Sequence, residues 1–360
     1  MKTVKVFFSL FLILVSSVAN SQEADRQVNI VDYLPKGYLK NASVDYTSVI
    51  QKVLDTHRKV VFPDFPILIN DNGLTLKSNS EINNAYLVMK PTNKRNYALL
   101  NIVEIRNVKL TNLHLKGDRY NHLDTKGEWG MGIYIKHASD ITIDNSIIEE
   151  FWGDGIDITK RNGMVPSDII IDNVTFKKNR RNGITISSGN NIIVQNCKFL
   201  YTDGVKPKAA IDIEPNSPID SLGNIKINNI YTSENGTGIQ ISMMNFPSVK
   251  KQSFFIEINK VKSVGDGHGI LVRDFYRKNK YGPKSIPLDG VVKFSNVEIL
   301  NSKEEPIKFF NNKEGYEYGP KYIFSKFKIK NDKNNTKKTS IEHIIGELKK
   351  RGFYTNDFKK

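Results

Sequence analysis

The sequence has 360 residues, of which 39% are hydrophobic, and a formal net charge of +15 at pH 7. This length allows one large domain or two modest ones, and the hydrophobic fraction excludes a multispan membrane protein. A single cysteine, Cys197, excludes intrachain disulfides and cysteine-rich metal clusters.

Residues 1–21 have the pattern of a secretory signal peptide. Lys2 and Lys5 precede an apolar run over residues 6–15, and small residues that suit cleavage near Ser21 follow it. The run is too short to span a bilayer, although an uncleaved N-terminal anchor is the alternative. We therefore expect a secreted or periplasmic protein with no membrane span after the signal peptide is removed.

Residues 22–100 are expected to form an N-terminal cap and the first coils of a repeat structure. Residues 44–57 have the apolar stripe of an amphipathic helix, which Ser43 or Asp45 would start. Because the ends of a solenoid expose its core, such a helix would serve as a plug.

Residues 101–330 contain an internal repeat. Segments of the form Gly-Ile-x-Ile, or a close variant, recur at spacings of 23 to 31 residues. They begin at Gly132, Gly155, Gly183, Ala210, Gly238 and Gly269. Each segment alternates apolar and polar residues and is rich in Ile, which is typical of a short β-strand. Strands at this period, without helical stretches between them, predict an all-β solenoid of the parallel β-helix type.

A second set of segments alternates with the first and ends in asparagine. The asparagines are Asn107, Asn145, Asn173, Asn196, Asn229 and Asn296, with Lys260 in this place once. We expect these side chains to stack at one corner of the coil, where amides can bond the copies above and below. The next residue in each segment, including Cys197, should point inward, so Cys197 is expected to be a buried small hydrophobic residue.

Residues 331–360 are expected to form a basic C-terminal tail. Residues 322–329 read as the last strand, and residues 340–351 as a short helix. The lysines of this tail supply much of the positive charge, which favours a polyanionic partner. An acidic polysaccharide suits an exported protein, and nucleic acid is not expected because no nucleic-acid-binding motif is present.

The N-terminal segments resemble those of pectate-lyase-like right-handed β-helix proteins, the pectin lyase fold. The matching segments are residues 28–33, the helix with residues 50–54, residues 60–63 and residues 76–79. With the later coils, the resemblance covers about residues 28–330 and implies a right-handed single-stranded parallel β-helix with an N-terminal capping helix. It does not fix the activity, because this superfamily contains lyases, hydrolases, epimerases, esterases and phage adhesins.

The outward positions of the Gly-Ile-x-Ile strands gather polar side chains that form a candidate site. The expected substrate-binding residues are Tyr134, Trp152, Asp154, Arg180 and Gln240. The expected catalytic residues are Asp157, Asp212, Glu214, Lys136, Arg181, His268 and Arg273. The alternative is that these residues form solvated ladders on an exposed sheet without a function.

The carboxylates of this site suit two kinds of chemistry. Asp157 and Asp212 are two coils apart, roughly 9 to 10 Å, which is at the upper end of the separation in inverting glycosidases. Glu214 could replace either residue, and the three carboxylates could instead hold Ca²⁺. A basic residue would then remove a proton next to a metal-bound uronate. Residues 154–157 and 267–269 resemble polygalacturonase segments, but Arg181 and Asn182 stand where that family has paired aspartates.

Three functions therefore stay open, and none requires an organic cofactor. The first is a polysaccharide lyase that cleaves a uronate-containing acidic polysaccharide by β-elimination, which the basic residues favour. The second is an inverting, polygalacturonase-like glycoside hydrolase, which the paired carboxylates favour. The third is a non-catalytic glycan-binding surface protein. The sequence does not determine the oligomeric state, or whether the loop of residues 272–290 forms a wall of the groove.

Overall fold

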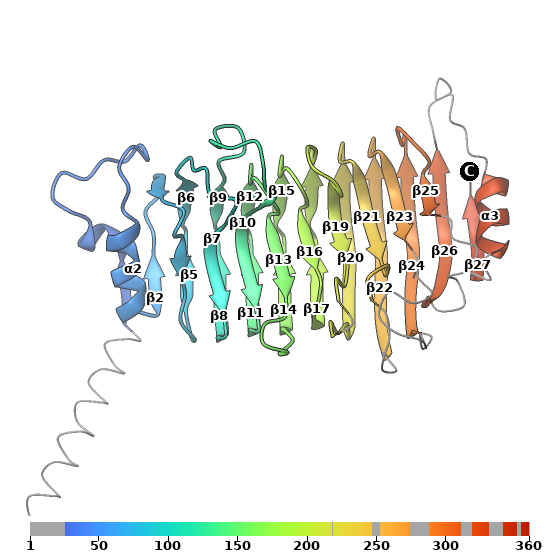
Figure 1. The fold of residues 1–360 in the computed structure, drawn as a ribbon, viewed down its shortest axis with the longest axis horizontal. Helices are drawn as coiled ribbons and strands as arrows, with labels where there is room; N and C mark the ends of the chain where they lie inside the picture. The colour runs from blue at the N-terminus through green and yellow to red at the C-terminus, as the bar shows by residue number, and fades with distance from the viewer. Residues whose placement is uncertain are drawn as a thin grey trace, which may run out of the picture.

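The computed structural model describes residues 26–217, 219–246, 253–273, 288–310, 319–330, 341–350 and 354–359. The predicted signal peptide and residues 274–287 of the predicted groove loop lie outside these ranges. The described strands stack into a rod with a helix near each end (Figure 1). Within the described ranges, no helix has the length and apolar character that a bilayer crossing requires.

The strands form two parallel sheets that run along the rod. The nine-stranded sheet consists of β4 (Leu74–Thr75), β7 (Asn96–Val103), β10 (Trp129–Lys136), β13 (Ile156–Thr159), β16 (Ile184–Ile186), β19 (Ala209–Ile213), β21 (Thr237–Ser242), β23 (His268–Arg273) and β25 (Ile307–Phe310). Neighbouring strands in this sheet pair in parallel, from one coil to the next.

The 18-stranded sheet covers the other faces of the coil. Its strands are β1 (Gln27–Asn29), β2 (Lys59–Val61), β3 (Ile67–Ile69), β5 (Glu81–Asn83), β6 (Tyr86–Met89), β8 (Arg106–Thr111), β9 (His114–Lys116), β11 (Ser139–Asp144), β12 (Ile147–Glu149), β14 (Ser167–Asp172), β15 (Thr175–Lys177), β17 (Asn190–Gln195), β18 (Lys198–Leu200), β20 (Asn224–Ser233), β22 (Ser253–Val264), β24 (Asp289–Leu300), β26 (Lys321–Lys330) and β27 (Tyr354–Lys359). Strands from different faces of the coil belong to this one sheet because β20 pairs with both β17 and β18.

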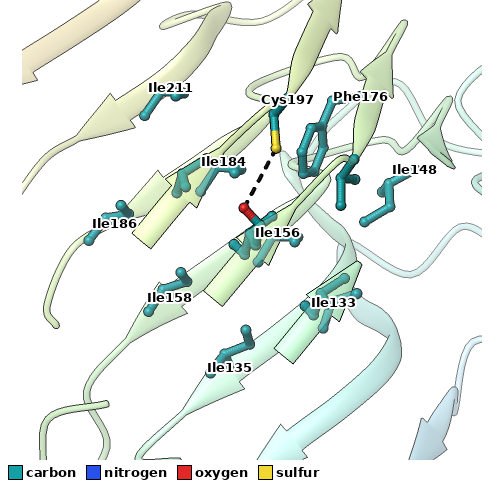
Figure 2. Close-up of a cluster of buried hydrophobic side chains, with 14 of the residues drawn as sticks. Ile133, Ile135, Ile148, Ile156, Ile158, Phe176, Ile184, Ile186, Cys197 and Ile211 are labelled. Carbon is teal, nitrogen blue, oxygen red and sulfur yellow. Dashed lines mark hydrogen bonds between the residues drawn. The ribbon is translucent and has the colours of Figure 1, made fainter. Parts of the chain in front are cut away.

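The core is built from the inward columns that the alternation predicts. Ile133, Ile156, Ile184 and Ile211 occupy successive coils of the nine-stranded sheet (Figure 2), and all four side chains are fully buried. Cys197 is buried opposite them, and its Sγ lies 3.7 Å from the Ile171 carbonyl oxygen. The prediction that Cys197 is a core residue is confirmed, and burial raises the pKa of its thiol to about 12.

The asparagine ladder is confirmed except for its first member. Asn145, Asn173, Asn196 and Asn229 all have positive φ, and the Asn229 amide donates to the Asn196 side-chain oxygen at 2.7 Å. Asn107 instead belongs to a different corner, where its amide donates to Asn79 at 2.9 Å. The expectation for Asn107 is wrong because the register of β8 and β11 pairs Asp144 with Thr111, so that Asn112 occupies the position equivalent to Asn145.

The two ends of the rod differ in how well the sequence predicts them. Helix α2 (Thr47–Thr56) is shorter than expected at both ends, and the Asp45 carboxylate accepts from the Thr47 backbone N–H at 3.0 Å. At the other end, α3 (Ile341–Lys350) agrees with the predicted helix, but β26 is not the last strand. Strand β27 returns after α3 and pairs with β26, with the Phe358 ring stacked on Phe327 at 5.0 Å.

Candidate functional site

The predicted outward column of the nine-stranded sheet exists in register. It consists of Tyr134, Asp157, Thr185, Asp212 and Gln240, which pair on the successive strands β10, β13, β16, β19 and β21. Although these side chains face away from the core, Asp212 and Gln240 are almost completely covered. The face is therefore a packed polar layer with a smaller accessible part, rather than a fully solvated ladder.

Asp154 anchors the layer where the chain enters β13. It is 0% exposed, and its carboxylate accepts from Arg181 Nη1 at 2.8 Å and from Thr185 Oγ1 at 2.6 Å. The Asn182 backbone N–H donates to its other oxygen at 3.0 Å. Burial raises the pKa of Asp154, and the Arg181 guanidinium opposes that rise. With no surface open to substrate, Asp154 serves to fix Arg181.

Asp157 is the carboxyl that combines partial exposure with a strong perturbation. Burial, followed by the neighbouring charge of Asp154, raises its pKa to about 7, against the opposing charges of Lys136 and Arg181. Near neutral pH, Asp157 therefore exists in both its protonated and its ionised form. Such a group can donate or accept a proton under physiological conditions.

Lys136 and Tyr134 both belong to β10 and lie next to Asp157 of the neighbouring strand β13. The Lys136 ammonium is 3.6 Å from the centroid of the Tyr134 ring, a close cation–π contact. Burial lowers the pKa of Lys136, although Asp157 partly restores it. Burial and the charge of Asp157 raise the pKa of Tyr134, so the phenol keeps its proton. The three side chains thus combine an amine that deprotonates more readily than usual, a phenol that keeps its proton and a carboxyl that titrates near neutral pH.

Asp212 lies on β19 and Glu214 follows directly after it, and each accepts hydrogen bonds from residues of neighbouring coils. Asp212 is 0% exposed and accepts from Asn182 Nδ2 at 3.3 Å and Gln240 Nε2 at 2.9 Å. Burial, followed by the charge of Glu214, raises the pKa of Asp212. Glu214 is partly exposed and accepts from Ser242 Oγ at 3.1 Å. Gln240 therefore lies in the site as a partner of Asp212 and not as a surface for substrate.

The calcium site expected at Asp157, Asp212 and Glu214 stays a prediction from the sequence. Among the residues that the structure describes, no group of three or more His, Cys, Asp and Glu side chains is arranged to hold a metal ion. Asp212 uses both oxygens in bonds to amide groups, so that binding a cation there would require these bonds to rearrange.

His268 and Arg273 do not join the group around Asp157. Both lie on β23, four coils beyond β13, which places them roughly 19 Å away along the rod at ~4.8 Å per coil. His268 is nearly buried, with Nδ1 2.9 Å from the Glu305 carbonyl oxygen, and Arg273 packs 5.0 Å above the Phe310 ring. The expectation that they belong to the same catalytic group as Lys136 is not supported. Residues at equivalent positions of the repeat lie on different coils, and here the coils are too far apart for the side chains to reach the same atoms.

Trp152 and Arg180 form a support behind the site. The Trp152 ring is 8% exposed, stacked between His122 at 4.1 Å and the Arg180 guanidinium at 3.6 Å. Arg180 also donates to the Gly127 carbonyl oxygen at 2.9 Å. Since both faces of the Trp152 ring are covered, the expected docking of sugar rings on it is not supported. The pair instead fastens the loop of residues 117–128 to the coil.

That loop is followed by an exposed aromatic residue that the repeat pattern does not predict. Trp129 begins β10 and is 47% exposed, beside Glu128, whose carboxylate is 3.8 Å from Arg181 Nε. The alternation in β10 does not predict its position, because Met131 packs with Tyr134 in a small cluster outside the main core. The available signal in the sequence was a Trp three residues before the predicted strand segment at Gly132.

Comparisons with known proteins agree with this architecture. The family model described as the right-handed β-helix region matches residues 94–274. Two relatives in Bacillus subtilis (strain 168) are the uncharacterized protein YclG, 27% identical over 52% of this chain, and the SPbeta prophage-derived uncharacterized protein YorA, 28% identical over 39% of it. The matches cover only 38% and 28% of these relatives' own lengths.

Solved structures share the fold at low sequence identity. The endo-xylogalacturonan hydrolase of Aspergillus tubingensis is 14% identical with a TM-score of 0.64, over 86% of both chains. PfbA, a surface adhesin of Streptococcus pneumoniae, is 15% identical with a TM-score of 0.62, over 86% of this chain and 80% of that one. Together with the family match, the stacked parallel coils show that the chain belongs to the right-handed β-helix family.

Proposed function

We propose that this protein is a carbohydrate-active enzyme that cleaves a uronate-containing polysaccharide by β-elimination. The observation that carries the proposal is the contact of the Lys136 ammonium with the Tyr134 ring beside Asp157. An elimination needs a base for the proton at C5 and an acid for the departing glycosidic oxygen. A lysine with a lowered pKa and a tyrosine that keeps its proton supply these two groups on one strand.

In the proposed reaction, neutral Lys136 removes the proton from C5 of the uronate. The electron pair of that C–H bond forms the C4–C5 double bond, and the bond from C4 to the glycosidic oxygen breaks. The Tyr134 hydroxyl protonates the leaving oxygen. Asp157, with a pKa of about 7, is protonated in a large fraction of molecules and then donates to the uronate carboxylate, which accumulates negative charge.

The second candidate function is glycoside hydrolysis, which the state of Asp157 favours. A carboxyl with a pKa of about 7 is a suitable general acid at neutral pH. Glu214 is the partly exposed carboxylate that would activate water, since Asp212 is completely buried. The structural similarity to a hydrolase supports this candidate only through the shared fold.

We propose that the protein acts outside the cytoplasm, as a secreted or periplasmic enzyme. The signal-peptide pattern of residues 1–21 supports this location. Similarity to a surface adhesin is compatible with it.

The test is to incubate the purified protein with polygalacturonate, alginate and xylan, with and without EDTA. Ultraviolet absorbance of the new double bond and the formation of reducing ends are both measured. Double bonds from an acidic polymer would support elimination, whereas reducing ends alone would support hydrolysis. Neither product, with binding retained, would overturn both and favour a glycan-binding protein.

The residue assignment is tested with Lys136→Gln and Tyr134→Phe. Removing a general acid or base typically lowers the rate by about 10²- to 10⁴-fold. The matched control is Lys109→Gln, which removes an exposed lysine of β8 in the other sheet. Equal activity of Lys136→Gln and Lys109→Gln would refute the role of Lys136.

A further inference from the structure

A line of lysines follows the C-terminal coils on the 18-stranded sheet, away from the candidate site. Its outward positions are Lys198, Tyr231, Lys262, Glu298 and Lys328, which pair in register on β18, β20, β22, β24 and β26. Lys260 lies beside this column, at the corner position that asparagine occupies in neighbouring coils. We call Lys198, Lys260, Lys262 and Lys328 the basic stripe.

The basic stripe borders a groove of about 430 Å³. Lys198, Lys260 and Lys262 line the groove with Tyr231, Glu298 and the corner asparagines. The three lysines are exposed, so their ammonium groups can reach a ligand that lies in the groove.

Within the described part of the chain, the lysines along the groove outnumber the carboxylates that pair with them. Among the described residues, Lys198 and Lys260 have no carboxylate partner. Lys262 Nζ is 3.5 Å from Glu298, and Lys328 pairs with the same carboxylate. One acidic side chain thus serves two lysines while two further lysines stay unpaired, which leaves a positive potential along the groove.

We propose that the basic stripe binds an acidic polysaccharide chain that lies along the rod. Lys198, Lys262 and Lys328 lie two strands apart in the column, so positive charges recur at roughly 9.6 Å along the rod, which suits a linear polymer with carboxylates or sulfates at a similar wide spacing. Duplex DNA carries a charge about every 1.7 Å, which is much denser than the stripe. Tyr231 is the aromatic residue of the groove lining, so the groove does not offer the succession of stacking rings that single-stranded nucleic acids use.

This site is independent of the proposed chemistry, because it lies on a different sheet from Lys136 and Asp157. It would hold a long polymer on the enzyme while the candidate site acts on another part of the chain. Short oligosaccharides, which cannot reach both places, would not benefit from it.

The test compares two triple variants of equal charge change. One carries Lys198→Gln, Lys260→Gln and Lys262→Gln in the stripe. The control carries Lys36→Gln, Lys52→Gln and Lys109→Gln, which replace exposed lysines in the N-terminal part of the rod. Binding of polygalacturonate and of duplex DNA is measured by biolayer interferometry at low and high NaCl, and thermal unfolding verifies that both variants are folded.

We expect the stripe variant to bind polygalacturonate about tenfold more weakly at low salt, and the control to change by less than about twofold. Glu298→Gln, which removes the opposing charge, should bind more tightly. An equal loss in both triple variants would show that only the net charge matters and would overturn the proposal. Stronger binding of DNA than of polygalacturonate, lost in the stripe variant, would overturn the choice of polysaccharide.

Failure of this proposal and failure of the proposed enzyme activity are distinguishable. Binding to the stripe needs no turnover, and turnover of short oligosaccharides needs no stripe. An active protein with an unaltered affinity in the stripe variant would refute the binding site alone.

Discussion

Replacing Asp157 with asparagine should stabilise the fold at high pH. Burial raises the pKa of Asp157 from 3.8 to about 7, so the folded state binds a proton more tightly than the unfolded state does. Between these two values the folded state carries more protons, and its stability therefore falls as pH rises from about 4 to about 7. Above about pH 7 the folded protein bears the full cost of a poorly solvated carboxylate, which asparagine does not impose.

The size of this effect follows from the shift. A change of about three pKa units, at ~1.36 kcal/mol for each unit, amounts to about 4 kcal/mol. Asp157 is partly exposed, so water relieves some of the cost, and we expect roughly 2 kcal/mol.

The assay is urea unfolding of the wild-type protein and of Asp157→Asn at about pH 4.5 and about pH 9. The difference in unfolding free energy between the two proteins cancels the titration of all other groups that the substitution leaves unaffected. We expect this difference to move in favour of Asp157→Asn as pH rises. A difference that does not depend on pH, or that moves the other way, would refute the assignment of a raised pKa to Asp157.

Three further predictions concern other parts of the chain. Trp129 and Trp152 are the two tryptophans of the sequence, and Trp129 is the exposed one. Oligogalacturonate should therefore change the intrinsic fluorescence of the wild-type protein but not that of Trp129→Phe. An unaltered response in the variant would exclude stacking of the sugar on Trp129. Arg181→Met leaves the buried carboxylate that it binds unpaired and should destabilise the fold by about 3 to 5 kcal/mol, measured by urea unfolding with the exposed Arg106→Met as control. Because burial raises the pKa of Cys197 to about 12, its thiol should react with iodoacetamide at about pH 8 only after unfolding, and rapid native-state alkylation would contradict that burial.

The sequence predicts the direction of site residues better than their accessibility. Period-two alternation places Asp157 and Asp212 on the outward face two coils apart, and the register of β13, β16 and β19 confirms this. The alternation does not show that Asn182 and Gln240 cover Asp212 or that Asp154 is completely buried. Those outcomes depend on side chains from neighbouring coils and loops, which lie about 27 to 31 residues apart in sequence.

The repeat pattern also groups residues that lie far apart along the rod. His268 and Arg273 occupy the same strand positions as residues near Asp157, but each coil adds ~4.8 Å and they lie at another part of the rod. Trp129 shows the opposite error, since it is exposed at the start of β10, next to the Glu128 that approaches Arg181, although no repeat position predicts it.

Strand alternation and repeat length are local properties of the chain, and they are sufficient to predict the parallel coils, the buried Ile columns, the burial of Cys197 and most of the asparagine corner. Which outward side chains meet depends instead on how the coils and loops pack against one another. Stacking coils buries Asp154 and Asp212 beneath their neighbours, leaves Asp157 partly exposed beside Lys136 and Tyr134, and gathers the basic stripe on another face. Burial and charge at each position arise from residues distant in sequence, and these two quantities set the pKa values that the proposed chemistry requires.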